Sequence, residues 1–219
     1  MSAQASQRAL APDVAELVSL SAAVAVADPE AVAACADRAL AAGAKAAAVY
    51  ETILQSYLFV GFPRAIEGFF AARDALAHAG GVLAAGNGYA WPSQADLAAW
   101  RRDGEALCRR VYGRNYERLR ARMDELSPEL GRWMILEGYG KTLSRSALDA
   151  PSREYAALAI LAVTRMWRQL RSHAIGALNV GGTREGVREA ITRTEPFCGA
   201  EGVRAALRAA GLRGGRDAG

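Results

Sequence analysis

Apolar residues recur along most of the chain at spacings of three and four positions, which is the period of a helix that buries one face. The first such stretch begins at Pro12 and runs to about Ala27. Asp28 and Pro29 then start a second stretch, which reaches a helix-ending glycine at Gly43. No segment alternates apolar and polar residues over the length of a strand. The pattern therefore predicts an all-α protein.

Further helices are expected through the rest of the chain, each bounded by glycine, proline or a capping residue. Residues 80–93 hold four glycines and one proline and are expected to form a loop. The segment GYGKTLSRSALDAPS, at 138–152, is rich in glycine and serine and is expected to be a connector. The other predicted helices lie at about 45–60, 63–78, 94–111, from 127 onward, and at 153–164, 166–179, 183–195 and 199–210.

The two ends of the chain overlay without a gap when one is shifted by 138 residues. Glu16 then falls on Glu154, and Gly43 falls on Gly181, so that helix-ending glycines mark the same breaks in both copies. We therefore expect two four-helix units that are related by this shift. The predicted division is a first repeat at 1–79, a helical insert at 80–150 and a second repeat at 151–219.

Composition and charge narrow the class of protein further. Basic and acidic residues give 27 − 23 = +4, and the acidic residues are interspersed among the basic ones, which argues against nucleic-acid binding. The three cysteines form no CxxC, and two histidines are too few for a metal site, so we expect no metal. No apolar window is long enough for a membrane span, and Asp13 and Glu16 precede the segment 17–27 where a signal peptide would be basic. We expect a cytoplasmic protein.

One pair of ionisable residues in the second repeat is a candidate for chemistry. Glu154 lies on the same helix face as Leu158 and Leu161, and His173 lies between Leu170 and Ala177 on the apolar face of the next helix. If the two helices turn near 164–166, the two side chains face each other at similar height. A carboxylate on a buried face needs a partner, and an imidazole would make it part of a proton-transfer couple.

Two interpretations of this pair remain open. The pair is either catalytic or a satisfied structural contact, because perturbed ionisable pairs also occur in structural roles. The first repeat provides an internal comparison: Glu16 corresponds to Glu154, but Cys35 stands where the histidine would be. We therefore expect only the second repeat to be active.

The residues at 152–191, SREYAALAILAVTRMWRQLRSHAIGALNVGGTREGVREAI, resemble the carboxymuconolactone decarboxylase family, which includes the alkylhydroperoxidase D proteins. In that family an Arg-Glu helix start precedes a histidine and an Ala-Leu-Asn-Gly-Thr segment, which here are Arg153-Glu154, His173 and 177–185. Segments 49–69 and 138–154 resemble the same family. The resemblance covers both repeats but not the insert, and it implies an alkylhydroperoxidase D-like helical fold.

For activity, the resemblance implies chemistry without a thiol. The family's CxxC positions correspond here to Met166 and Gln169, so thiol-dependent peroxide reduction should be absent. What remains resembles the cofactor-free decarboxylases, which act on a lactone acid. On this basis His173 is the general acid and Glu154 orients it. Substrate contacts are then expected from Met166, Trp167 and Gln169 in the pocket wall, from Tyr139 as a hydrogen-bond donor, and from Arg171 at a substrate carboxylate.

Three functions follow as hypotheses from the resemblance. The first is a cofactor-independent lyase or related enzyme that acts on a small organic acid or lactone. The second is a catalytically silent family member with a binding or stress-associated role, in which Met166 and Trp167 fill the cavity. The third is a thiol-dependent antioxidant, for which Cys35 is the thiol to consider. Family members usually assemble as trimers or hexamers, so a homo-oligomer is expected, with no nucleic-acid or membrane partner.

Overall fold

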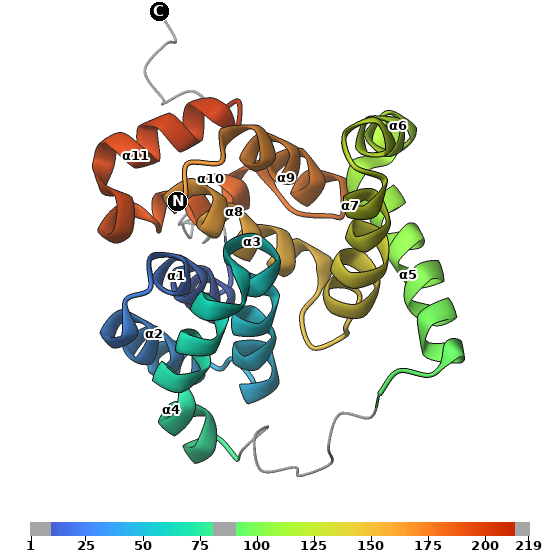
Figure 1. Cartoon of the computed structure of the whole chain (residues 1–219). Coiled ribbons are helices and arrows are strands. Elements are labelled where there is room, and N and C mark those ends of the chain that lie inside the picture. Colours follow the sequence, from blue (N-terminus) through green and yellow to red (C-terminus); the bar gives the residue numbers. More distant parts are fainter. Residues whose placement is uncertain (1–9, 81–90, 213–219) are drawn as a thin grey trace, which may run out of the picture.

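The computed structural model describes residues 10–80 and 91–212 (Figure 1). All regular secondary structure in these two ranges is helical, which confirms the predicted all-α class. Ten residues of the predicted loop at 80–93, namely 81–90, lie outside the described ranges, as do 1–9 and 213–219 of the predicted domains. No described helix is both long and apolar enough to span a membrane.

The first group of helices is α1 (Pro12–Val26), α2 (Pro29–Ala41), α3 (Ala46–Ala71) and α4 (Arg73–His78). The carboxylate of Asp28 accepts a hydrogen bond from the Ala31 backbone N–H, 3.0 Å away, and caps α2 as its position before Pro29 predicts. The helix expected at 45–60 is the first part of α3 and is separated by a kink at the non-helical Gly61 from the second part, which with α4 covers the helix expected at 63–78. Buried aliphatic side chains of α1–α4 form one apolar cluster.

The middle group consists of α5 (Gln94–Tyr112), a 3-10 turn at Gly113–Asn115, α6 (Tyr116–Leu126), α7 (Pro128–Trp133) and the π-helix η2 (Met134–Leu143). Its helices stand at the right of Figure 1, in green to yellow. The Ser127 hydroxyl accepts a hydrogen bond from the Leu130 N–H and caps α7. Side chains of α5, α6 and η2 form a separate apolar cluster.

The connector expected at 138–152 is wrong over its first six residues, which belong to η2. The reason is a close crossing between η2 and α5. A Cβ atom at Gly140 would overlap the backbone of Trp100, and one at Gly104 would overlap the backbone of Ile135 and Gly140. The glycines therefore permit helix-to-helix backbone contact here, and composition alone does not distinguish this use from a loop.

The last group is α8 (Ala150–Val163), α9 (Trp167–Asn179), α10 (Arg184–Thr192) and α11 (Glu195–Ala209). Helix α8 lies at the centre of the molecule, where it packs against α1, α3, α9, α10 and α11. Eleven consecutive residues of α8, 152–162, are buried. This position explains why its sequence is apolar on all sides rather than on one stripe.

The shift of 138 residues also relates the helices of the first and last groups. The bounds of α2, 29 + 138 = 167 and 41 + 138 = 179, are those of α9. Backbone exceptions recur at the same shift: Gly61 has φ 79° and ψ 169°, and Gly199 has φ 71° and ψ 167°. Ala27 and Arg165, the non-glycine residues with positive φ in the described ranges, are related in the same way. On this correspondence we propose the division into two repeats with an insert between them.

Candidate active site

Glu154 and His173 are in direct contact between α8 and α9. The Nδ1 atom of His173 lies 2.8 Å from Oε2 of Glu154. The two helices are joined by a tight turn at 164–166, in which Arg165 adopts a left-handed conformation. Glu154 is 4% exposed, and the imidazole side chain is 11% exposed. The expected pairing of the two side chains is therefore present in the structure.

A glycine on α9 makes room for the carboxylate. A Cβ atom at Gly176 would lie 3.0 Å from Oε2 of Glu154 and 2.7 Å from Cγ1 of Val111 on α5. Both distances are shorter than ordinary van der Waals contact. Any larger residue at 176 would displace Glu154 or α5, so this glycine fixes the approach of α8, α9 and α5 around the pair.

The contact with Glu154 determines which imidazole nitrogen is available for chemistry. An ionised carboxylate only accepts hydrogen bonds, so an ionised Glu154 selects the tautomer of neutral His173 in which Nδ1 carries the hydrogen and Nε2 presents its lone pair. The ring of Phe59, from α3, meets the imidazole edge-on, with centroids 5.5 Å apart. The imidazole is thus held from two sides, with Nε2 on the side of the ring opposite Nδ1.

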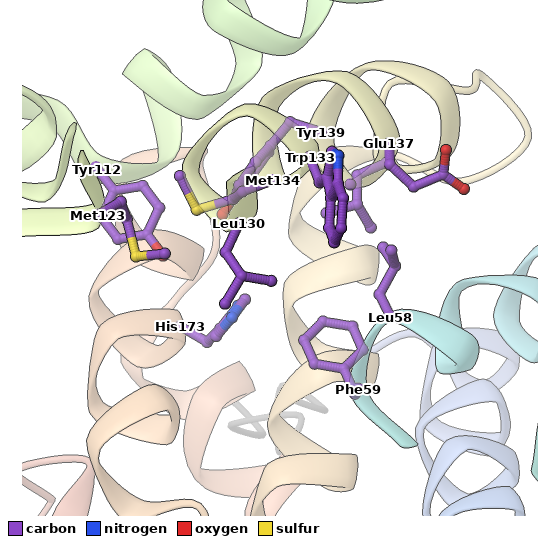
Figure 2. A pocket seen from close by; sticks show the side chains of 12 residues that line it. Leu58, Phe59, Tyr112, Met123, Leu130, Trp133, Met134, Glu137, Tyr139 and His173 are labelled. Atoms are coloured by element: carbon purple, nitrogen blue, oxygen red, sulfur yellow. The ribbon is translucent and has the colours of Figure 1, made fainter. Parts of the chain in front are cut away.

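His173 is one of twelve residues that line a cavity of about 350 Å³ (Figure 2). This volume lies at the lower end of the range for small-molecule sites. Seven of the lining residues carry leucine, methionine, phenylalanine or tryptophan side chains, so most of the wall is apolar. In Figure 2, Leu130 points toward the imidazole from the opposite wall. The lining residues are Leu58, Phe59, Tyr112, Met123, Leu130, Trp133, Met134, Glu137, Gly138, Tyr139, Leu143 and His173.

The π-helix η2 supplies the wall opposite α9. A π-helical segment has a wider turn than an α-helix and is frequent at functional sites. It brings Met134, Tyr139 and Leu143 to one cavity. Tyr139 is therefore at the cavity, where its predicted role as a hydrogen-bond donor requires it to be.

Tyr139 forms a pair with Tyr112 of α5. Their rings meet edge-on with centroids 6.2 Å apart, and their hydroxyl groups are hydrogen-bonded to each other. Burial raises the pKa of Tyr112 to about 12 and raises the pKa of Tyr139 well above its usual value, and the charge of Glu154 contributes to both shifts. Both hydroxyls therefore remain protonated at neutral pH and are available as donors.

Glu137, also on η2, is the other carboxylate of the lining. Its Oε1 accepts hydrogen bonds from the Tyr57 hydroxyl, 2.7 Å away, and from the Lys141 ammonium group, 2.9 Å away. In Figure 2 the carboxylate points away from His173. Glu137 is thus held at the edge of the cavity, and Lys141 directs its charge to Glu137 rather than into the cavity.

Four of the predicted substrate contacts do not line this cavity. Met166, Gln169 and Arg171 are exposed, and Trp167 is half-buried against the apolar cluster of α8–α11. The physical reason is that α9 contributes only His173 to the cavity, and the rest of its wall comes from α3, α5, α6, α7 and η2. The roles predicted for these four residues therefore have no support from their positions.

Most of the cavity wall comes from residues that sequence reasoning did not select. Tyr112, Met123, Leu130 and Met134 all lie in the insert, outside both repeats. Trp133 lies in the same insert. Because contacts between segments far apart in sequence place these residues, no local pattern marks them.

The cysteines are not placed for thiol chemistry at this cavity. Cys35 and Cys108 are buried, and none of the three cysteines lines the cavity. Burial raises the pKa of Cys35, and it raises the pKa of Cys108 to about 12, so both remain thiols at neutral pH. In the described ranges, no group of three or more His, Cys, Asp or Glu residues could hold a metal ion.

A comparison with family models finds a match for the part of the chain that holds Glu154 and His173. Residues 128–211 match the model described as the carboxymuconolactone decarboxylase family. This segment is similar to the carboxymuconolactone decarboxylase family. The carboxymuconolactone decarboxylase segment runs from α7 to α11 and includes Tyr139, Glu154 and His173, so it begins inside the region that the sequence assigned to the insert. A comparison with curated proteins gives no match.

Proposed function

We propose that the chain is a cofactor-independent enzyme in which His173 transfers a proton to or from a carbon atom of a small organic acid or lactone. The supporting observation is the contact of 2.8 Å between His173 Nδ1 and Glu154 Oε2, made by an imidazole that lines an apolar cavity. Glu154 orients the ring and stabilises the imidazolium that forms when Nε2 takes a proton.

Decarboxylation of a lactone acid and migration of a double bond both use this step. In decarboxylation, CO2 leaves, the electron pair of the broken C–CO2 bond passes into an enolate, and the imidazolium form of His173, which has taken a proton from solvent, donates that proton from Nε2 to carbon. In isomerisation, His173 removes a proton from one carbon and returns it to another. An apolar cavity favours both reactions, because the developing charge is spread over the substrate and little water competes for it.

The observations support this proposal over the two alternatives. A thiol-dependent peroxidase needs an accessible thiolate, and Met166 and Gln169 occupy the positions of the family's dithiol. A silent protein was expected to have its cavity filled by Met166 and Trp167, and neither residue lines it.

We also propose that the chain assembles as a homo-oligomer, a trimer or hexamer, in the cytoplasm. Helix α3 carries Phe62, Ile66 and Phe70 at four-residue spacing, and each is at least 49% exposed. Such a stripe is suited to contact with another subunit. Light scattering of the purified chain, with Ile66→Arg for comparison, tests the assembly; a wild-type monomer would contradict it.

The catalytic proposal is tested by screening lactone acids for CO2 release, and neutral lactones for exchange of carbon-bound hydrogen in deuterated water. We expect the wild type to be active on at least one compound and His173→Ala to be inactive on the same compound. Glu16→Gln is the matched control, because Glu16 is the counterpart of Glu154 in the first repeat and lies outside the cavity. Equal activity of wild type and His173→Ala would refute the proposal.

A further inference from the structure

The charges around the cavity restrict the ligands that it binds. Of the twelve lining residues, none is arginine or lysine, whereas Glu137 contributes a carboxylate and Glu154 lies directly behind His173. Lys141 is held by Glu137 and lies over the ring of Trp100, with 5.8 Å between Nζ and the ring centroid. Arg171 is exposed and outside the lining.

A substrate carboxylate would therefore enter this cavity without a cationic partner. An ionised carboxylate loses much of its hydration in an apolar site, and this loss is recovered only where opposite charge or several donors replace the water. Here the nearest fixed charges of the lining are negative. A neutral ligand has no such cost.

The Tyr112–Tyr139 pair supplies an uncharged hydroxyl donor, which can form a hydrogen bond with the oxygen of a neutral carbonyl group. Two hydroxyl groups that share one hydrogen bond retain one further O–H hydrogen between them. Among the described residues, neither Tyr112 nor Tyr139 has another hydrogen-bond partner. Tyr139 is 4% exposed, Tyr112 is half-buried, and both line the cavity, so the remaining hydrogen, whichever hydroxyl carries it, can be donated to a ligand there.

We propose that the cavity binds a neutral, largely hydrocarbon ketone or lactone that carries no free carboxylate, and that its carbonyl oxygen accepts a hydrogen bond from the Tyr112–Tyr139 pair. This inference rests on the proposed function of His173 and names the substrate class for it. It assigns Tyr112, a residue of the insert, to substrate binding.

The proton transfer then balances without any further reactant. His173 Nε2 takes the proton from the carbon next to the carbonyl group, and the electrons of that C–H bond form a carbon–carbon double bond. The carbonyl π electrons move to oxygen, where the tyrosine hydrogen bond stabilises the enolate. Return of the proton to the same carbon gives hydrogen exchange, and its return to a conjugated carbon gives an isomer.

The experiment compares two probes that share one ring system, beta-tetralone and the corresponding tetralin carboxylate. Binding to the full chain is measured by calorimetry above the pKa of the free acid. We expect the ketone to bind at least about tenfold more tightly than the carboxylate, because transfer into an apolar cavity costs an ionised carboxylate far more hydration free energy than a neutral ketone. Equal binding, or tighter binding of the carboxylate, overturns the inference.

Variants of the tyrosines test the hydrogen bond. Tyr112→Phe and Tyr139→Phe are each expected to weaken ketone binding by about three- to tenfold and to leave carboxylate binding unchanged. Tyr116→Phe is the matched control, since Tyr116 is buried nearby at 5% exposure but does not line the cavity. Thermal melts identify any variant that fails to fold. Unchanged ketone binding in both folded tyrosine variants overturns the inference.

Hydrogen exchange of bound beta-tetralone in deuterated water separates this inference from the proposed function. His173→Ala is expected to bind the ketone and to lose the exchange. Selective ketone binding without exchange in the wild type would support the ligand class and refute the catalytic role of His173. Exchange that continues in a chain that prefers the carboxylate would support the catalytic role and refute the ligand class.

Discussion

The Nε atom of Arg38 lies 2.9 Å from Oε2 of Glu16, and this ion pair takes the place in the first half of the chain that the Glu154–His173 pair has in the second. Arg38 corresponds to Gly176 by the shift, 38 + 138 = 176. Its Nη2 also lies 3.0 Å from the sulfur of Cys35, the counterpart of His173. Glu16 is thus bound to Arg38, whose guanidinium group is always charged, and its Oε1 also lies 3.1 Å from Nη1 of Arg193. Because arginine does not lose its proton at neutral pH, these contacts do not make Glu16 part of a proton-transfer pair.

Removal of the imidazole or its orienting carboxylate should abolish most of the activity. We expect His173→Ala to lower kcat/KM by about 10²–10⁴-fold, which is the usual contribution of a general acid or base. Glu154→Gln should cause a smaller loss, because the ring loses its orientation but keeps Nε2. Steady-state kinetics on a substrate found by the screen provides the measurement. Glu16→Gln should match the wild type, and a similar loss in that variant would show that the effect is not specific to the site.

Substitution at Gly176 should disturb the site through packing. Gly176→Ala places a methyl group 3.0 Å from the Glu154 carboxylate and 2.7 Å from Val111, so we expect a loss of about 1–3 kcal/mol of unfolding free energy and reduced activity. Urea titration and activity assays check both. Gly138→Ala, at a helical glycine where a Cβ would meet no atom within 4 Å, is the control for stability. A more stable Gly176→Ala variant would contradict the packing account.

The buried ion pair between the two halves should be a major contributor to stability. Arg153, 2% exposed, donates hydrogen bonds to Glu51 Oε2 at 2.9 Å and to Gln55 Oε1 at 3.1 Å, and Arg145 also binds Glu51. Glu51→Gln leaves a buried guanidinium without its charge partner, so we expect a loss of about 3–5 kcal/mol.

Chemical denaturation of Glu51→Gln measures this loss. The exposed pair of Arg73 and Asp74 provides the comparison, and Asp74→Asn should change stability by no more than about 0.5 kcal/mol. Similar small effects of both substitutions would show that the buried pair contributes no more than a surface contact.

Removal of all three thiols should leave the activity in place. In a chain that carries Cys35→Ala, Cys108→Ala and Cys198→Ala, we expect kcat/KM to stay within about twofold of the wild type, because none of these residues lines the cavity. Stability should fall, since Cys35 and Cys108 are fully buried and their loss leaves small cavities. Complete loss of activity in a folded variant would revive the thiol-dependent alternative.

The tyrosine pair should make the protein less stable at alkaline pH. The pKa of Tyr112 is raised from 10 to about 12, so the folded chain holds this proton more tightly than the unfolded chain. The resulting stability is fully present below about pH 10 and is lost as the pH rises toward 12. Tyr112→Phe should flatten this decline. Denaturation midpoints across this interval test it, and an identical decline in both proteins would contradict it.

Local patterns in the sequence were sufficient for the helices and for the Glu154–His173 pair. Glycine, proline and capping residues mark helix ends because their effects on the backbone act within a few residues, as at Asp28 and Gly43. The pair could be inferred because one turn between two adjacent helices fixes the relative height of its members. The resemblance to the carboxymuconolactone decarboxylase family is confirmed by the match at 128–211.

The surroundings of that pair follow from long-range packing. Gly104 and Gly140 allow the close backbone contact between η2 and α5, and the Tyr112–Tyr139 pair joins the same two helices. Met166, at the N-cap of α9, and Gln169, within α9, are exposed, whereas Leu58 and Phe59 reach the cavity from α3. A cavity is the space between elements that are distant in sequence, so its wall follows from long-range packing rather than from local spacing.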